Sequence, residues 1–301
     1  MTSFEIDLQD DILKQKKADT QLSLVWRQFK RHKLALIGAI ILPIFILIAI
    51  FGNWIMPYDP IEIHPEINVG MPLAPEKDHL LGTDNFGRDI VSRLISGGQI
   101  SLSVGFVAVG FGMLLGVTLG SLAGFFGGWI DTLVTRTADV FLALPRLFLI
   151  MIANLYLGQT VFNVMLIIGM FSWMGVARLV RGEFLKLKSL EYISASYALG
   201  ASPWKIILTH LLPNSFAPVI VAATIGIPYA ILMESSLSFL GLGVPPPQAS
   251  WGNMLFDAKN FLNVAPWFWI PPGLMISISV ICFNFIGDGL RDAFDPTQHN
   301  R

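Results

Sequence analysis

Four charged side chains lie within or at the edge of long apolar stretches: Asp139, Arg146, Glu234 and Asp288. A charge in the middle of a bilayer costs about 2.5 to 3.5 kcal/mol on insertion scales, so each of them is a candidate for function. Asp139 and Arg146 are seven positions apart, roughly two helical turns, which would place them on one helix face but too far apart for direct contact. We therefore expect each to find a partner on another helix.

Sequence patterns typical of enzymes and metal sites are missing from the chain. It has no His-Glu-x-x-His or Gly-x-Ser-x-Gly motif, and no Gly-Lys dipeptide, so it lacks the Walker A loop that cradles nucleotide phosphates. The histidines are scattered without metal-ligand spacing, and the single cysteine, Cys282, lies in an apolar run. We expect no catalytic residue, no metal site and no cofactor bound by this chain.

The composition points to the bilayer as the solvent. Hydrophobic residues make up 53% of the 301 residues and charged residues only 14%, against roughly 25% charged in an ordinary soluble domain. A soluble core of this size could not hide so much apolar surface. The net charge of -1, with Lys and Arg dispersed along the chain, argues against a nucleic-acid partner.

Several apolar stretches are long enough to cross a membrane. A helix needs roughly 20 apolar residues to span the hydrocarbon core. One of the stretches is long enough for two spans, joined by a tight turn near Gly158. The sequence therefore predicts an all-α membrane protein with six transmembrane helices, in residues 34–56, 100–130, 137–178 (two spans), 215–233 and 260–287.

The distribution of Lys and Arg predicts the orientation. An even number of spans puts both termini on one side, and most basic residues then fall in segments on that side. The positive-inside rule makes this side cytoplasmic. We expect a cytoplasmic tail (1–33), a first transmembrane helix (34–56), an external segment (57–98), a core with five further spans (99–290) and a cytoplasmic tail (291–301).

Two amphipathic helices are predicted outside the spans. Apolar positions between residues 22 and 29 recur at helical spacing beside basic side chains, which suggests a helix on the membrane surface, with a solvated tail as the alternative. Apolar positions between residues 86 and 95 repeat opposite Arg88 and Arg93, which predicts a separate helix at the outer surface. Prolines at 245–247 are expected to end the fifth span.

Glycines recur at every fourth position of the second predicted span. Such spacing forms a smooth ridge on one helix face and lets another backbone approach closely. Each Gly costs about 1 kcal/mol of helix propensity relative to Ala, so a packing gain should offset it. A ridge that lines a transport path is the alternative. The ridge consists of Gly112, Gly116, Gly120, Gly124 and Gly128.

The longest inner segment, residues 178–213, has the pattern of two short helices. The first should end at Gly200, and the second should begin with Ser202 as its cap and Pro203 in its first position. Pro213 should end the second helix. The expected apolar faces are Leu190, Ile193 and Tyr197 in the first helix, and Trp204, Ile207, Leu208, Leu211 and Leu212 in the second.

At these residues the sequence resembles the membrane permeases of ABC importers. Their cytoplasmic motif reads Glu-Ala-Ala, three residues, Gly, nine residues, Ile, any residue, Leu-Pro. Gly200, Leu212 and Pro213 keep both identity and spacing, whereas Ser194 replaces Glu and His210 replaces Ile. The positions that the resemblance assigns to ATPase coupling are Ser194, Ala195, Ser196, Gly200, Ala201, Leu212 and Pro213.

Other stretches narrow the resemblance to the dipeptide, oligopeptide and nickel permease family, in particular its second permease subunit. They are residues 81–93, 237–243, 250–253 and 283–296. The resemblance implies a type I ABC importer permease fold in a prokaryotic plasma membrane. It also implies a second permease, two ATPase subunits that bind ATP and Mg, and an external lipoprotein that delivers a peptide substrate. Paired cytoplasmic helices would sit in a groove on each ATPase and carry its motion into the spans.

The substrate and the transport path stay open at this stage. The same family pattern serves dipeptides, oligopeptides, nickel chelates and other solutes, and a self-sufficient channel or ion-driven carrier is the alternative of another class. Glu234, near the outer end of the fifth span, is the one candidate for the path. There it could touch a peptide amine, although a structural role that lets the acid reach the interface is the favoured interpretation.

Overall fold

The computed structural model describes residues 21–63 and 70–294, and within these ranges it contains helices and no strand. The helices are α2 (Gln21–Phe29), α3 (Lys33–Ile50), α4 (Gly52–Ile55), α5 (Ile90–Phe126), α6 (Gly128–Ala143), α7 (Arg146–Leu157), α8 (Val161–Met170), α9 (Trp173–Lys188), α10 (Glu191–Ala198), α11 (Pro203–Ile206), a π-helix η1 (Ile207–Leu211), α12 (Leu212–Asn214), α13 (Phe216–Phe239), α14 (Trp251–Ala258), a short 3-10 helix η2 (Lys259–Phe261) and α15 (Pro266–Phe294).

Five helical units are long and apolar enough to cross a membrane: α3, α5, α8 with α9, α13 and α15. The pair α6 and α7 passes the same test together, although it is bent by 95°. The prediction of an all-α protein with six spans is therefore confirmed when the bent pair counts as one span. Several helix ends differ from the predicted bounds: α5 begins at Ile90 instead of residue 100, α6 begins at Gly128 instead of residue 137, and α9 ends at Lys188 instead of residue 178.

The bend between α6 and α7 corrects the expectation that Asp139 and Arg146 share a helix face. Pro145 precedes α7, and Leu144 is extended, with φ −94° and ψ 144°. A proline disfavours the helical conformation in the residue before it, so α6 ends at this point. Asp139 lies on α6 and Arg146 begins α7, on either side of the bend.

Helix α5 is the central element of the bundle. Its 37 residues extend about 55 Å at 1.5 Å per residue, which exceeds the roughly 30 Å of a hydrocarbon core. The separate outer helix predicted around residues 86–95 is wrong, because Asp89 caps α5 and the helix then continues without a break to Phe126. Arg88 and Arg93 are buried in ion pairs, whereas the sequence pattern placed them on a solvent face.

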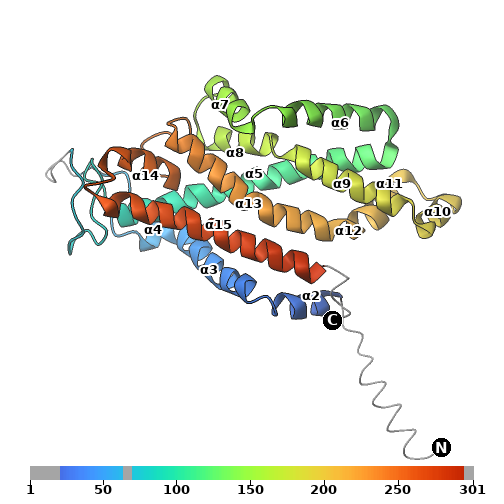
Figure 1. Ribbon diagram of the computed structural model, residues 1–301, viewed down its shortest axis with the longest axis horizontal. Helices are drawn as coiled ribbons and strands as arrows, with labels where there is room; N and C mark the ends of the chain where they lie inside the picture. The colour runs from blue at the N-terminus through green and yellow to red at the C-terminus, as the bar shows by residue number, and fades with distance from the viewer. Residues whose placement is uncertain (1–20, 64–69, 295–301) are drawn as a thin grey trace, which may run out of the picture.

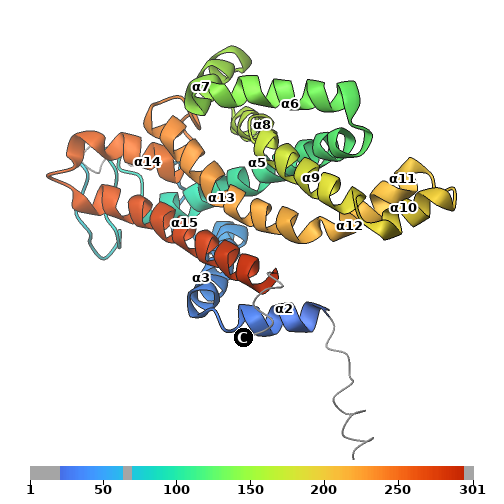
Figure 2. The ribbon, with the colours of Figure 1, turned by 45° about the vertical axis from the view of Figure 1, so that its right-hand side comes forward.

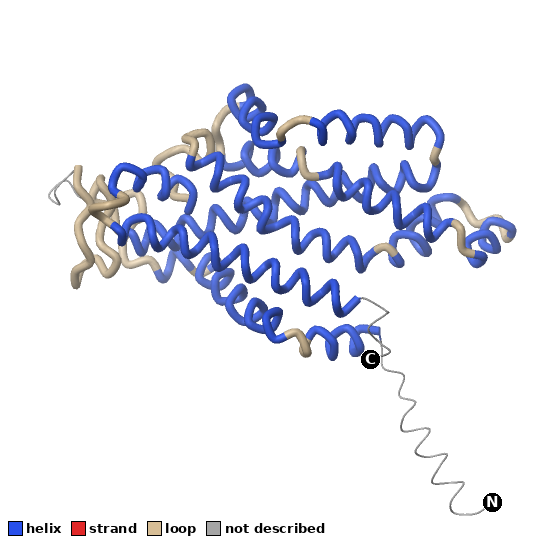
Figure 3. Tube along the Cα trace, in the orientation of Figure 1, coloured by secondary structure: helices blue, strands red, loops and turns tan. Residues whose placement is uncertain are grey.

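Helix α5 packs against α8, α9 and α13 (Figure 1). The largest apolar core lies between α5, α8, α13, α14 and α15. After rotation, α6 and α7 form a layer on one side of this group, and α2 and α3 lie on the other (Figure 2). Most of the long loops gather at one end of the bundle, beside α14, and α10 and α11 project from the other end (Figure 3).

The helix predicted between residues 22 and 29 is present as α2 and packs on α15 near the end of the described chain. Phe29 is buried with Ala35 and Ala293, and His32 lies 3.9 Å from Asp292. The first and last described helices thus meet at one end of the bundle. The side of the membrane that this end faces stays a prediction, and residues 1–20 and 295–301 of the predicted tails lie outside the described residues.

The glycines of the predicted ridge lie along α5 where it packs on α9 and the connection from α8. An added Cβ at Gly112 would lie 2.9 Å from Ser172 Cβ, one at Gly120 2.6 Å from the Ala177 carbonyl oxygen, and one at Gly124 2.7 Å from Phe184 Cβ. Gly116 meets Val176 in the same way. Gly128 was expected to extend the ridge, but α5 ends before it and an added Cβ there would meet nothing within 4 Å.

Candidate functional site

The turn between α10 and α11, at the end of the bundle that is predicted to be the inner one, is shaped by its local sequence. Gly200 has φ +78°, a left-handed conformation that L side chains adopt at a cost. Its N–H donates to the Tyr197 carbonyl at 2.9 Å, and the Ala201 N–H donates to the Ser196 carbonyl at 3.1 Å. These two bonds form a Schellman motif. The turn therefore satisfies the carbonyls at the end of α10 and reverses the chain within three residues.

The second helix begins as predicted but changes its winding after one turn. The Ser202 hydroxyl accepts a hydrogen bond from the Lys205 N–H at 3.4 Å, and Pro203 occupies the first turn. Residues 207–211 then form a π-helix. In a π-helix the backbone hydrogen bonds join residues five positions apart instead of four, which changes the residues that share a face. The buried side chains of this segment are Ile206, Ile207 and Leu211.

The π-helix divides the predicted apolar stripe of the second helix between two surfaces. Ile207 and Leu211 are buried, whereas Trp204 and Leu208 are 58% and 60% exposed. Leu199, just before the turn, is 88% exposed, and Tyr192 on α10 is 42% exposed. We call these four exposed residues, Tyr192, Leu199, Trp204 and Leu208, the inner apolar cap, after the side of the membrane on which the sequence predicts them. Exposed apolar side chains outside the spanning helices are candidates for protein association.

The inner apolar cap stands on a packed base. Ile193 of α10 and Ile206 of α11 are fully buried in one cluster with Val180 and Phe184 of α9. Lys188 at the end of α9 donates to the Phe125 carbonyl at the end of α5, at 2.7 Å. The helices that carry the cap are thus tied to two long helices of the bundle, so that the cap and the bundle should move together.

The structure brings the predicted coupling residues into one compact element, residues 191–214. Ser194, Ala195, Gly200 and Pro213 are exposed, whereas Ser196, Ala201 and Leu212 are partly buried. The Ser196 hydroxyl donates to the Tyr192 carbonyl at 2.9 Å. Sequence reasoning did not identify Tyr192 and Leu199 as surface residues. Leu199 lies directly before Gly200, at the end of α10.

Charged residues of α6 pair with residues of α9. Asp139 pairs with Arg178, and Asp131 pairs with Arg181 through both carboxylate oxygens. The expectation that Asp139 has a partner on another helix is confirmed. The pair of Asp131 and Arg181 was not foreseen, because its members are 50 residues apart in the sequence. Asp288, on α15, is exposed.

Arg146 meets an aromatic ring instead of an acid. Its guanidinium lies 5.0 Å from the ring centre of Tyr229 on α13, which confirms that its partner is on another helix. This geometry is a cation–π contact. Arg146 and Tyr229 line a recess of about 340 Å³ between α5, α7, α9 and α13.

Glu234 is completely buried, so the expectation that it reaches the interface is wrong. Its carboxylate accepts hydrogen bonds from Ser238 at 2.6 Å and from Ser101 of α5 at 3.1 Å. Ser235 lies at 3.5 Å. Hydroxyl groups from two helices therefore surround the carboxylate, and its role in this structure is to hold α5 and α13 together.

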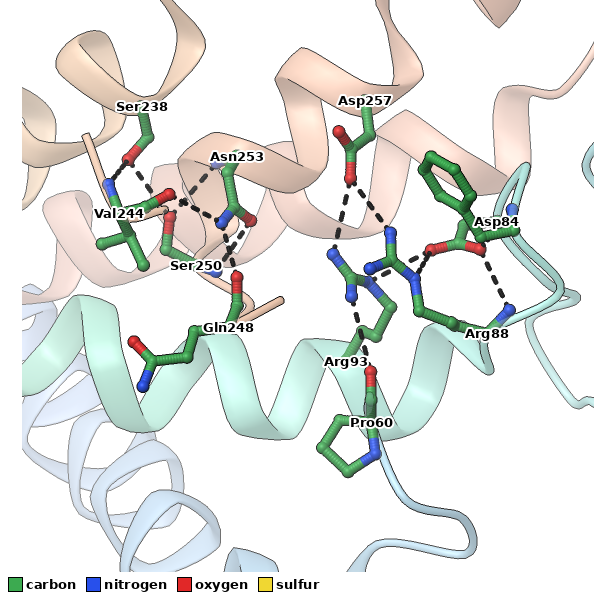
Figure 4. A network of polar contacts seen from close by, with 11 residues as sticks. Pro60, Asp84, Arg88, Arg93, Ser238, Val244, Gln248, Ser250, Asn253 and Asp257 are labelled. Atoms are coloured by element: carbon green, nitrogen blue, oxygen red, sulfur yellow. Dashed lines mark hydrogen bonds and ion pairs between the residues drawn. The ribbon is translucent and has the colours of Figure 1, made fainter. Parts of the chain in front are cut away.

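The end of the bundle beside α14, which the sequence predicts to be the outer end, carries a buried network of charges (Figure 4). Arg88 donates through Nε to Asp84 at 2.6 Å and through Nη2 to Asp257 at 3.3 Å. Arg93, which is 2% exposed, lies 3.3 Å from Asp84 and 3.5 Å from Asp257. Burial raises the pKa of Asp257 on α14, and the charges of Arg93 and Arg88 act in the opposite direction. Each arginine thus contacts both carboxylates.

A second polar network fixes α14 beside the end of α13. Asn253 and Ser250 form a capping box at the start of α14, and Asn253 also donates to the Gln248 carbonyl at 2.8 Å (Figure 4). The indole N–H of Trp251 donates to the Leu94 carbonyl of α5 at 3.0 Å. Three of the stretches that carry the resemblance, 81–93, 237–243 and 250–253, therefore meet at this end of the bundle.

Comparisons with known proteins assign this helical bundle to a protein family. The family model of the binding-protein-dependent transport system inner membrane component matches residues 116–300, and the model of the N-terminal transmembrane domain of oligopeptide transport permease C matches residues 20–75. The chain belongs to this family of binding-protein-dependent permeases. It is therefore a multi-span membrane permease subunit, and a transport protein by family.

Relatives of this permease match it over most of their length. It is 43% identical over 271 residues to the dipeptide transport system permease protein DppC of Alkalihalophilus pseudofirmus, covering 90% of this chain and 88% of that one. It is 40% identical to the oligopeptide transport system permease protein OppC of Bacillus subtilis, covering 89% and 87%. It is 39% identical to the glutathione transport system permease protein GsiD of Pectobacterium atrosepticum, covering 95% and 94%.

A solved structure supports the fold of the permease. A chain of the MetNI methionine ABC transporter in inward-facing conformations matches with a TM-score of 0.57 and 21% sequence identity. The match covers 67% of this permease and 97% of that chain. The likeness confirms the predicted ABC importer permease fold.

Proposed function

We propose that this permease, together with a second permease, forms the path of an ATP-driven importer of small peptides. The observation that carries the proposal is the inner apolar cap, which lies exposed on a base that is packed into α5 and α9. A stiff projecting surface of this kind suits the transmission of force from another subunit, because a flexible loop would absorb the motion. The names of the relatives, which refer to dipeptides, oligopeptides and glutathione, support peptides as the substrate class.

In the proposed complex, two ATPase subunits bind ATP and Mg, and each pair of inner helices docks on one ATPase. An external binding lipoprotein delivers the substrate to the opposite end of the bundle. Both termini of the permease and residues 191–214 are cytoplasmic, and the outer charge network faces the exterior of a prokaryotic plasma membrane. The coupling residues are Ser194, Ala195, Ser196, Gly200, Ala201, Leu212 and Pro213.

Reconstitution of the complete importer in proteoliposomes tests the proposal. We expect uptake of a labelled dipeptide that requires both ATP inside the vesicle and the binding protein outside. Uptake by the permease alone would instead support a self-sufficient channel or ion-driven carrier. ATP-dependent uptake of a nickel chelate without peptide uptake would keep the architecture and change the substrate.

Two substitutions in the inner apolar cap test the docking surface. Leu199→Ala and Trp204→Ala remove exposed side chains, so the fold should be unaffected, but the ATPases should no longer co-purify and uptake should be lost. Leu114→Ala on α5 is the matched control, because Leu114 is similarly exposed at 65% and lies outside residues 191–214. Normal uptake by both cap variants would refute the docking surface.

A further inference from the structure

Arg146 is a charged side chain of a membrane-spanning unit with no acidic partner. Among residues 21–63 and 70–294, no carboxylate lies within ion-pair distance of its guanidinium, and its aromatic contact is with Tyr229. The neighbouring charges differ in this respect, because Arg178 and Arg181 both pair with acids of α6. An arginine in a membrane is costly unless an anion or water compensates it. Within the described residues the guanidinium of Arg146 has no acidic partner, so it is available to pair with an anionic group that enters the recess.

The recess beside Arg146 has the size of a ligand site. Its volume of about 340 Å³ falls in the range of small-molecule pockets, about 300 to 1,000 Å³. Glycines at positions 112, 175 and 226 line it, and an added Cβ at Gly175 would meet nothing within 4 Å. Ser172 contributes a hydroxyl group to the lining. The missing side chain at Gly175 thus leaves space open in the recess that Arg146 lines.

The recess also lies where a transported molecule would pass. Gly112 is in the interior of α5 and Gly226 near the middle of α13, two helices that are long and apolar enough to cross a membrane. Ser172 and Gly175 come from the break between α8 and α9 and from the turn after it. The recess is therefore placed at mid-span, between the outer charge network and the inner apolar cap.

We propose that this recess binds the carboxylate end of the transported substrate, with Arg146 as its counter-ion. This inference rests on the proposed function and names the chemical group that the path recognises. A guanidinium presents paired N–H groups that match the two oxygens of a carboxylate, and the cation–π contact with Tyr229 holds the guanidinium in place. The ligand is a small molecule, because the recess has the volume of a small-molecule pocket.

The first experiment compares two substrates in the complete reconstituted importer. The uptake kinetics of alanyl-alanine and of its C-terminal amide are measured for the wild type and for Arg146→Gln and Arg146→Lys. For each peptide, kcat/KM of the variant is divided by kcat/KM of the wild type, and this ratio cancels the preference of the binding protein for one of the two peptides. Loss of a charge-assisted contact should reduce kcat/KM for the free acid by about 10- to 100-fold in Arg146→Gln, and less in Arg146→Lys, while leaving the amide unchanged.

The second experiment fills the recess without touching Arg146. Gly175→Leu places an isobutyl group in open space, and we expect uptake of the free acid to fall about tenfold or more, although the complex assembles normally. Gly182→Leu is the matched control, because Gly182 lies two turns further along α9, its Cβ would also meet nothing within 4 Å, and it does not line the recess. Its uptake should stay at the wild-type level.

Several outcomes would overturn the inference. Equal losses for the acid and the amide in Arg146→Gln would show that Arg146 does not read the carboxylate. If Arg146→Gln no longer co-purified with the second permease, the partner of Arg146 would be an acid of that subunit. If anionic lipid raised the melting temperature of the wild type but not of Arg146→Gln, the partner would be a lipid headgroup. Normal uptake by Gly175→Leu would show that the recess stays empty during transport. A wild-type importer that takes up no peptide would refute the proposed function itself.

Discussion

The hydroxyl of Ser101 on α5 donates to the carboxylate of Glu234 on α13 at 3.1 Å, and neither side chain is exposed. This contact joins two spanning helices through a buried polar cluster. Removing one partner of such a cluster leaves buried hydrogen-bonding groups unsatisfied, at a cost of about 1 to 3 kcal/mol each. We expect Glu234→Ala to lower the melting temperature of the purified permease, whereas Glu234→Gln, which keeps an acceptor for the serines, should melt close to the wild type. Melting of Glu234→Gln as low as that of Glu234→Ala would show that the charge itself is required.

Two glycines of α5 should respond oppositely to the same substitution. At Gly120 an added Cβ would lie 2.6 Å from the Ala177 carbonyl oxygen of α9, so Gly120→Ala should separate the helices and cost about 1 to 3 kcal/mol. At Gly110 an added Cβ would meet nothing within 4 Å, so Gly110→Ala should gain up to about 1 kcal/mol of helix propensity. Melting temperatures in one detergent give the comparison. Similar values for both variants would contradict the close approach of α5 and α9.

The buried and exposed ion pairs should differ in their effect on stability. Arg93 is 2% exposed between Asp84 and Asp257, so Arg93→Met leaves uncompensated buried charge and should destabilise the fold by about 3 to 5 kcal/mol. Arg178 and Asp139 are both 48% exposed, so Arg178→Met should cost at most about 1 kcal/mol. Tryptophan fluorescence during thermal unfolding measures both variants. A larger loss in Arg178→Met than in Arg93→Met would contradict the assignment of burial.

Gly200 offers a test of coupling that separates backbone conformation from side-chain bulk. Its left-handed conformation disfavours β-branched side chains by about 1 to 2 kcal/mol, whereas Asn tolerates it. An added Cβ would meet nothing within 4 Å, so bulk alone is no obstacle within this chain. We expect Gly200→Val to lose ATP-dependent uptake at unchanged membrane abundance, and Gly200→Asn to retain it. Normal uptake by Gly200→Val would count against the turn as a coupling device.

Local signals predicted the turn between α10 and α11 and the approximate positions of the spans. The turn at Gly200 and the start of α11 follow from a glycine, a serine cap and a proline that are adjacent in the sequence. The spans could also be predicted locally, from the apolar runs. A segment that crosses the membrane must satisfy its backbone hydrogen-bonding groups internally, so a long apolar run forms a helix. The bend at Pro145 also had a local signal, which the length of the apolar run concealed.

Contacts between distant residues could not be predicted. Arg88 and Arg93 have the spacing of a solvent face, and Asp257, which pairs with both, is 169 and 164 positions away. The π-helix at residues 207–211 was not predicted, and it determines which apolar side chains of the second helix are buried. The recess beside Arg146 is formed by four helices and has no signature in any one stretch of sequence.

From Pro203 to Phe239 the backbone is helical except at Ser215, where α12 passes into α13. The Ser215 N–H still donates to the Leu211 carbonyl at 3.0 Å, so hydrogen bonding is maintained across this residue. Tyr229 and Glu234 lie on the same run as Trp204. If a neighbouring subunit displaced Trp204, this nearly continuous helical run would thus transmit the displacement to Tyr229, whose ring contacts Arg146, and to Glu234, whose carboxylate joins α13 to α5.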